Sequence, residues 1–135
     1  MDKFYINHVA VFVCALLSLV VGAIWYSPLL FFKTWQRENG LSDEQIAKAK
    51  PLKTYSITFL LGWIISYNLA FFLATGKTNW QWGLTAGLLA GVGWASTMLI
   101  IIGLFEQHSW KRILINCGYT TVYFGLCGFI LGIWR

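Results

Sequence analysis

The sequence predicts an all-α, polytopic membrane protein with four transmembrane helices, and three observations support this prediction. Four apolar stretches, at residues 6–25, 55–75, 82–105 and 113–134, contain no Asp, Glu, Lys or Arg. Each holds about 20 to 24 residues, and a helix needs about 20 to cross the hydrocarbon core. Only 11% of the residues are charged and 58% are hydrophobic, whereas an average soluble domain has about 25% charged residues.

The bilayer decides the type of spanning element. Because hydrocarbon offers no water to the backbone, a spanning segment must satisfy its own amides, and barrel strands would be about half as long as these stretches. A buried soluble core is the alternative, but a soluble domain this small has too little interior to shield four such helices from water. We therefore expect one four-helix transmembrane domain over residues 1–135.

The first stretch, residues 6–25, is expected to remain as a helix rather than to be removed as a secretory signal. It lacks a basic region before it and a small-residue cleavage pattern after it. The basic residues then predict the orientation of the chain. The segments at one end of the predicted spans carry seven basic residues: Lys33, Arg37, Lys48, Lys50, Lys53, Lys111 and Arg112. The segments at the other end carry three: Lys3, Lys77 and Arg135.

The positive-inside rule places the side with seven basic residues in the cytoplasm. Both termini are then periplasmic in a bacterial cytoplasmic (inner) membrane. This topology accounts for the net charge of +5. Since the basic residues do not cluster on a folded module, we expect no nucleic-acid partner.

The first cytoplasmic loop carries a pattern of its own. Aromatic and apolar residues interleave with basic ones across residues 29–37 and predict a short amphipathic helix on the membrane surface; the interfacial residues are Pro28, Phe31, Phe32 and Trp35. Gly40 ends this helix, Ser42 and Gln45 form a capping box that begins a second one, and Pro51 is expected to stop it. The loop is a protein-partner surface or a lid; alternatively it only turns and anchors the chain.

Small residues at intervals of four or seven predict where the helices pack. Membrane helices associate through close van der Waals approach, which small side chains permit. The third helix continues its stripe to Ala95, and Ala86, Ala90 and Gly93 lie off that stripe, so we expect a homo-oligomer. The predicted packing glycines are Gly22, Gly62, Gly83, Gly87, Gly91, Gly118, Gly125 and Gly132.

Two segments carry a resemblance to a known family. They are the run Gly22-Ala23-Ile24-Trp25-Tyr26-Ser27-Pro28-Leu29, continuing to Lys33 and Trp35, and the run Ile115-Asn116-Cys117-Gly118-Tyr119, leading to Gly128, Ile130, Leu131, Gly132 and Trp134; Asn7 and His8 precede the first helix. The chain resembles a bacterial family of small four-helix integral membrane proteins catalogued only as a domain of unknown function. Phe32 replaces an expected glycine, and Thr120 stands where many members have histidine. The resemblance implies no established activity.

Polar residues inside the spans are the remaining clue to function, because they are costly in hydrocarbon and face the bundle interior or a cavity. The fourth helix has a polar ridge, which lines a path or pocket or else only makes interhelical hydrogen bonds. Trp94 lies near the middle of its span, where it lines a cavity or else packs against lipid. The candidate pore or pocket residues are Asn68, Trp94, Thr97, Asn116, Tyr119, Thr120 and Tyr123.

His8 is a gating candidate, since histidine titrates near neutral pH, although a histidine beside Asn7 is also typical of a helix start. We expect no enzyme, no catalytic residue, no metal and no cofactor. His8 and His108 fall on opposite faces of the membrane, and the three cysteines show no paired spacing. The spans also lack the acid that a proton-coupled small exporter requires. The expected function is an oligomeric channel or transporter for a small solute; the alternative is a structural or partner-binding membrane subunit.

Overall fold

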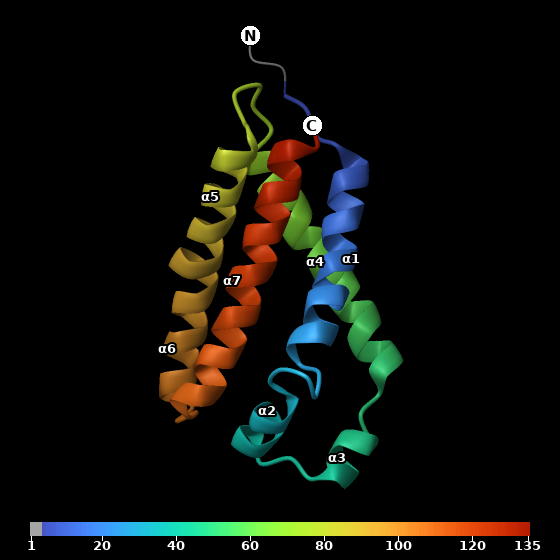
Figure 1. The fold of residues 1–135 in the computed structure, drawn as a ribbon, viewed down its shortest axis with the longest axis vertical. Coiled ribbons are helices and arrows are strands. Elements are labelled where there is room, and N and C mark those ends of the chain that lie inside the picture. The colour runs from blue at the N-terminus through green and yellow to red at the C-terminus, as the bar shows by residue number, and fades with distance from the viewer. Residues whose placement is uncertain (1–3) are drawn as a thin grey trace.

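The computed structural model describes residues 4–135, and in that range it contains helices and no strand (Figure 1). The elements are α1 (His8–Trp25), α2 (Phe32–Asn39), α3 (Asp43–Ala47), α4 (Pro51–Phe72), α5 (Trp80–Ala90), the π-helical segment η1 (Gly91–Ser96), α6 (Thr97–Phe105) and α7 (Trp110–Ile133). The segments α5, η1 and α6 form one continuous span, Trp80–Phe105. With α1, α4 and α7 this gives four helices long and apolar enough to cross a membrane. The predicted fold class is confirmed.

The second and fourth spans begin earlier than predicted, and capping explains both differences; the second span also ends at Phe72 rather than at residue 75. The second span begins at Pro51 rather than at residue 55, because proline fits the first turn of a helix, where its missing N–H is not needed. Pro51 therefore starts α4 instead of stopping α3. The fourth span begins at Trp110 rather than at residue 113, since the Ser109 hydroxyl accepts a hydrogen bond from the Arg112 backbone N–H at 3.2 Å.

The short helices of the first loop follow their caps. The predicted capping box is present: Ser42 Oγ accepts from Gln45 N at 3.2 Å, and Gln45 Oε1 accepts from Ser42 N at 2.8 Å. Gly40 ends α2 in the left-handed conformation, with φ of 65°, which glycine adopts without strain. The amphipathic helix begins only at Phe32, because residues 28–31 form turns after Pro28.

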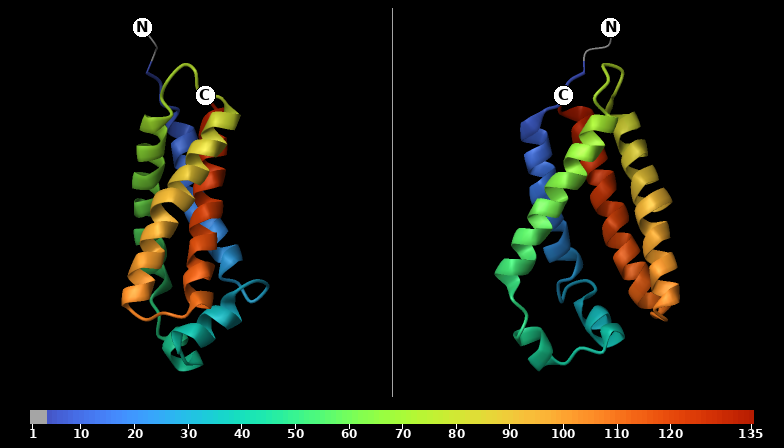
Figure 2. Two further views of the ribbon diagram at one scale, coloured as in Figure 1. Left: turned by 90° about the vertical axis from the view of Figure 1, so that its left-hand side faces the viewer. Right: turned by 180° about the vertical axis from the view of Figure 1, so that it is seen from behind.

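The four spans do not form a closed bundle. Helix α1 packs against α4 on one side and α7 on the other, and α7 in turn packs against α5, η1 and α6. Helix α4 meets α7 only briefly and does not pack closely against α5. Figure 2 shows α4 slanting across the back of the molecule and away from the α5–α6 span toward α3. The buried core lies where α1, α4 and α7 meet, around Val11, Cys14, Leu73 and Cys127.

Glycines make the α5–α7 interface close. A Cβ atom placed on Gly83 would collide with the backbone oxygen of Gly128, and one placed on Gly128 would collide with the backbone oxygen of Gly83. The π-helical turn then shifts the small-residue stripe by one position, so that Ser96 is buried against α7 and Ala95 is not. The prediction of Ala95 in the stripe was wrong, because it assumed α-helical spacing throughout.

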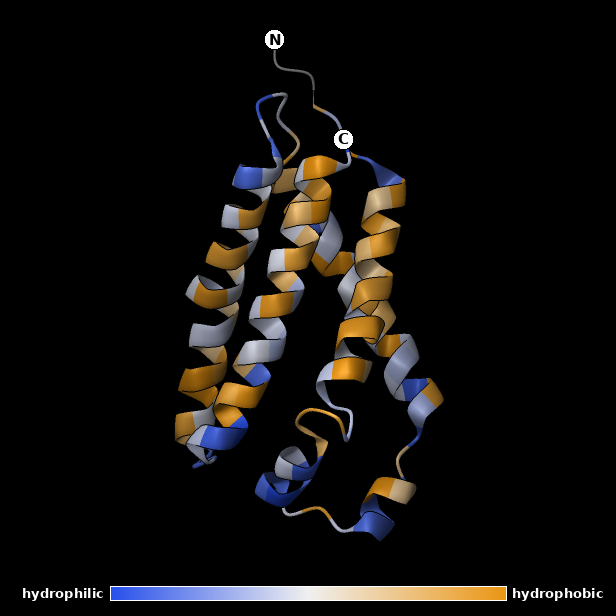
Figure 3. Cartoon of the chain, viewed as in Figure 1, coloured by the Kyte–Doolittle hydropathy of each residue, from blue (hydrophilic) through white to orange (hydrophobic). Residues whose placement is uncertain are grey.

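Hydrophobic residues make up most of the length of the four spans, and the most hydrophilic residues gather toward the ends of the molecule (Figure 3). The first described residues and the C-terminus lie at one end, and α2, α3 and the α6–α7 connection lie at the other (Figure 1). The seven basic residues that predict the cytoplasmic side are all on the α2–α3 side, whereas Lys77 and Arg135 are on the side of the termini. Lys3 lies outside the described residues. This is the pattern of a multi-pass membrane protein.

Candidate functional site

The polar ridge of α7 makes hydrogen bonds within the fold. Tyr119 Oη donates to the backbone oxygen of Ser18 at 2.7 Å. Tyr123 Oη donates to the backbone oxygen of Cys14 at 3.0 Å. Thr120 Oγ1 donates to the Asn116 backbone oxygen of its own helix at 3.1 Å. Three tyrosine and threonine hydroxyls of the ridge thus bond to backbone oxygens of α1 and α7.

The exit from α1 docks on the fourth ridge residue, Asn116. Tyr26 Oη donates to Asn116 Oδ1 at 2.7 Å, and the Trp25 indole N–H donates to the Ile115 backbone oxygen at 2.8 Å. The Trp25 ring lies against Gly118, where a Cβ atom would collide with it. The two sequence segments that carry the family resemblance are therefore in direct contact, a pairing that the sequence analysis did not anticipate.

The burial of Tyr26 in this contact has an electrostatic consequence. Tyr26 is the residue that follows α1, at the end of the span. Burial raises the pKa of the Tyr26 hydroxyl above its ordinary value of 10.0, and Tyr119 and Cys117 add to the effect. The neutral hydroxyl is therefore the form that the folded protein favours, which suits a donor to Asn116.

Aromatic residues of the first loop cover this contact. The Phe31 ring centroid lies 4.8 Å from that of Trp25, and the Trp35 centroid lies 6.0 Å from that of Tyr26. Phe32 stacks on Trp35 at 6.3 Å. Phe31, Phe32 and Trp35 are half-buried, whereas Leu29, next to Pro28 in the turn, is 91% exposed. The interfacial loop residues thus hold α2 against the bundle and leave Leu29 as its free apolar tip.

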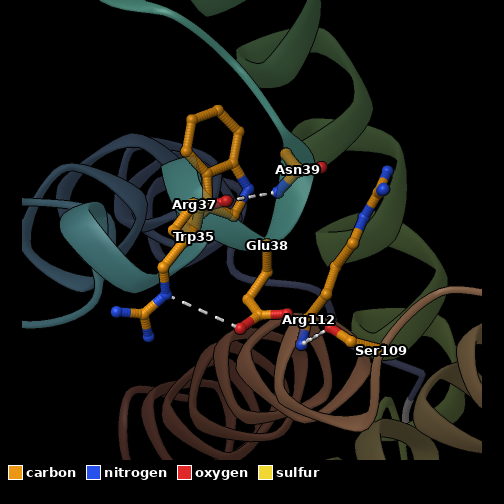
Figure 4. Close-up of polar contacts among 6 residues, drawn as sticks. All are labelled: Trp35, Arg37, Glu38, Asn39, Ser109 and Arg112. Carbon is orange, nitrogen blue, oxygen red and sulfur yellow. Dashed lines mark hydrogen bonds and ion pairs between the residues drawn. The ribbon is translucent and has the colours of Figure 1, made fainter.

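A carboxylate of α2 lies near the start of α7 (Figure 4). The Glu38 side chain is only 19% exposed, and its Oε1 atom lies 3.8 Å from Arg37 Nε. It points toward the first turn of α7, where the Ser109 hydroxyl accepts a hydrogen bond from the Arg112 backbone N–H and caps the helix (Figure 4). A negative charge near a helix N-terminus is favourable because of the unpaired N–H groups there. The Asn39 amide donates to the Trp35 backbone oxygen at 2.7 Å and closes α2.

A groove lies between α4 and the α5–η1 segment, with α7 as its floor. Its volume is about 610 Å³. Two of the seven predicted pocket residues line it, Asn68 from α4 and Trp94 from η1. The walls and floor are apolar, and their large members are Ile64, Ile65, Leu69, Phe72, Leu89 and Phe124. We refer to this space as the lateral groove.

The polar groups of the lateral groove are only partly used by the fold. Asn68 Nδ2 donates to the Ile64 backbone oxygen at 2.8 Å. The Asn68 side chain makes no other hydrogen bond among residues 4–135. Trp94 is 74% exposed, and its indole N–H has no partner in the same range. Thr97 is not among the residues that line the groove. Its hydroxyl proton is shared between the backbone oxygens of Gly93 and Trp94, each 2.8 Å from Thr97 Oγ1.

The π-helical segment forms one wall of the groove. Ser96 anchors it to α7: its hydroxyl donates to the Cys117 backbone oxygen at 3.3 Å, and the Cys117 thiol donates to the Ser96 backbone oxygen at 3.6 Å. On the same segment Gly93 and Trp94 line the groove. Such π-helical insertions are frequent at functional sites. Two glycines of η1, at positions 91 and 93, are the only hint of it in the sequence.

His8 lies away from the lateral groove, at the end that carries the termini. Its Nδ1 atom is 2.8 Å from Tyr67 Oη, and it borders a second cavity of about 640 Å³ formed by residues 4–9 and Phe71. The two cavities share no lining residue. Among residues 4–135 no cluster of three His, Cys, Asp or Glu side chains is placed to hold a metal ion.

Every predicted packing glycine except Gly22 would bring an added Cβ atom to 3.0 Å or less from a neighbour. At Gly22 that atom would lie 3.6 Å from the Tyr119 ring, an ordinary contact. The neighbouring atoms belong to another span in each case, so these glycines permit close approach between spans. The glycines concerned are Gly62, Gly83, Gly87, Gly91, Gly118, Gly125 and Gly132.

Comparison with known proteins gives a family but no activity. A family model described as "Protein of unknown function (DUF1761)" matches residues 9–132, so the chain belongs to this family, and the predicted kinship with an uncharacterised family is confirmed. No curated protein and no solved structure matches the chain.

Proposed function

We propose that this DUF1761 member is an oligomeric transport protein that binds a small solute in the lateral groove. The observation that carries the proposal is Asn68, an amide that faces the groove from a membrane-spanning helix and whose oxygen has no hydrogen-bond partner among residues 4–135. A polar side chain in a span is costly unless it has a partner. A bound solute supplies that partner.

The contrast with α7 favours a carrier over an open channel. A channel through one copy would need polar groups aligned along a continuous path, but the hydroxyls of Tyr119, Thr120 and Tyr123 are bonded to backbone oxygens. The lateral groove instead opens to the side between α4 and α5. A solute that is dissolved in the bilayer therefore has direct access to Asn68.

Association of copies follows from the same open side. Ala90 and Gly93 line the groove, are at least partly exposed and would let a helix of a second copy approach closely. Such a neighbour would cover the groove and separate its solute from bulk lipid. We propose the homo-oligomer on this ground.

Flux measurement tests the proposal. Liposomes that contain the purified protein are loaded with a panel of small neutral and charged solutes. The flux of each solute through Asn68→Leu is compared with the flux through the wild type. One intramembrane hydrogen bond contributes about 1 to 2 kcal/mol, so we expect affinity for the transported solute to fall about tenfold. Thr85→Val is the matched control, since Thr85 is exposed on α5, bonds to its own helix and lies outside the groove. Flux equal to that of empty liposomes for every solute would reject transport.

A structural or partner-binding subunit is the second candidate, and the exposed Leu29 favours it. Because Phe31 and Trp35 pack on the bundle, the free apolar surface of the loop is at Leu29 and Leu30. Under this candidate a second protein co-purifies and Leu29→Ser releases it, while Asn68→Leu has no effect.

The cellular placement is part of the proposal. Seven basic residues on the α2–α3 side support a cytoplasmic location for that side and a periplasmic location for both termini in a bacterial inner membrane. We assign the protein no catalytic role and no cofactor, in line with the sequence. His8 and His108 are at opposite ends of the spans, and His108 pairs with Glu106 at 3.0 Å.

A further inference from the structure

We infer that the ligand of the lateral groove is an uncharged, largely apolar molecule with a hydrogen-bonding oxygen such as a ketone, ester or hydroxyl. This inference rests on the proposed function and specifies the chemistry of the solute. It follows from three properties of the groove: its open polar groups, its lack of charge and its position along the spans.

The open polar groups require an oxygen on the ligand. Among residues 4–135, Asn68 keeps one N–H and its carbonyl oxygen free after its bond to the Ile64 backbone oxygen. A plain hydrocarbon chain leaves all of these groups unpaired. A ligand oxygen accepts from the amide N–H, and a hydroxyl additionally donates to the amide oxygen.

The absence of charge excludes ionic ligands. Among residues 4–135, those that line the groove include no Asp, Glu, Lys, Arg or His. An ion placed there would lose its hydration without gaining a counter-charge, and that penalty is large in hydrocarbon. The groove therefore does not bind a ligand that carries a carboxylate or an ammonium group there, but it can bind one that carries a neutral oxygen.

The position of the groove orients the ligand. Asn68 is four residues, or about 6 Å, from the end of α4, whereas Trp94 is 14 residues, or about 21 Å, into the span that begins at Trp80. The polar oxygen thus lies near the membrane surface that carries the termini. The apolar part extends inward between Leu89, Phe124 and Trp94 in a space of about 610 Å³, which fits a small amphipathic molecule.

Photo-crosslinking tests the inference. Three diazirine probes with one chain length carry a ketone, a carboxylate or no oxygen, and each is added to the protein in phosphatidylcholine liposomes. Mass spectrometry then locates the labelled residues in the wild type, in Asn68→Leu and in the control Thr85→Val. We expect the ketone probe to label groove residues, and we expect that labelling to fall about tenfold in Asn68→Leu and to persist in Thr85→Val.

Two results would overturn the inference: carboxylate labelling of the groove at or above the ketone level, or ketone labelling that is unchanged in Asn68→Leu. A repeat in ether-linked phosphatidylcholine, which lacks ester carbonyls, distinguishes the source of the oxygen. Ketone labelling that rises there identifies the bilayer lipid ester as the competing occupant, and equal labelling identifies a free molecule. Ketone labelling without flux retains the ligand class and rejects transport, whereas Asn68-dependent flux of a charged solute retains transport and rejects the ligand class.

Discussion

The α5–α7 interface and the lateral groove are built on the same span and have opposite properties. Toward α7, the span presents Gly83 and Gly87, whose neighbours across the interface are backbone atoms of Phe124 and Gly128. Toward α4, it presents Leu89 and, after the π-helical turn, Trp94, and a space of about 610 Å³ remains. One side of the span is closed by backbone contact and the other is held open by side chains.

The difference shows how residue size decides between packing and binding in hydrocarbon. No hydrophobic force brings apolar helices together in lipid, so contact forms where two backbones fit closely. Small residues on both α5 and α7 meet this condition. On α4 the facing residues are Ile64, Asn68 and Phe72, which keep the helices apart. We therefore expect stability to depend on the closed side and ligand binding to depend on the open side.

The largest expected effect is at the closed side. Gly87→Ala places a methyl group against the Phe124 backbone oxygen, which cannot move as a side chain can, so we expect a loss of about 1 to 3 kcal/mol in unfolding free energy. Gly93→Ala is the matched control, because an added Cβ there meets nothing within 4 Å. Thermal or denaturant unfolding in detergent measures both variants. Equal stabilities would refute the view that backbone contact closes this interface.

A smaller effect is expected at the α1–α7 contact, under alkaline conditions. Since the pKa of Tyr26 is raised in the folded protein, folding holds a proton that the unfolded chain releases above about pH 10. The stabilising contribution is complete below that pH and is lost as the pH rises toward the folded pKa. We expect the free energy of unfolding of Tyr26→Phe to fall less steeply above pH 10 than that of the wild type. One fully shifted group changes this slope by at most about 1.4 kcal/mol per pH unit. Because Tyr26 is only half-buried, we expect a fraction of that maximum.

The control for this pH experiment is Tyr55→Phe, which removes an exposed tyrosine hydroxyl from the same side of the molecule. Unfolding curves between pH 8 and pH 11 compare the two variants with the wild type. An identical decline in the wild type and Tyr26→Phe would mean that Tyr26 titrates normally in the folded state.

The parts of the fold that depend on local physics were predictable. Span lengths follow from bilayer thickness, the Ser42–Gln45 capping box from local hydrogen bonding, and the small-residue face of the third span from glycine spacing, although the spacing does not say which span packs against it. The start of α4 was wrong because proline both ends and begins helices, and here the tertiary context decides. The π-helical turn was missed because it is a property of packing against α7, with no fixed residue pattern.

The candidate site was harder to predict, since sequence alone gives polarity but not partners. Asn68 and Asn116 are indistinguishable in the sequence, since each is an amide inside a predicted span. Only the packing shows that Asn116 receives the Tyr26 hydroxyl at 2.7 Å, while Asn68 faces the lateral groove. The helical register that brings Trp94 to the same groove depends on the extra residue in η1, which the sequence does not reveal.

The smallest expected effect is at Asn68, and a comparison with Asn116 separates the two amides. Asn116→Leu removes the partner of the half-buried Tyr26 hydroxyl and is expected to destabilise the fold by about 0.6 to 1.7 kcal/mol. Asn68→Leu removes an amide that bonds only within its own helix turn, so unfolding free energy should change by less than about 0.5 kcal/mol. The same unfolding assay measures both. A large loss in Asn68→Leu would show that Asn68 supports the fold, and the reduced labelling or flux of that variant would then have a structural cause rather than a lost ligand contact.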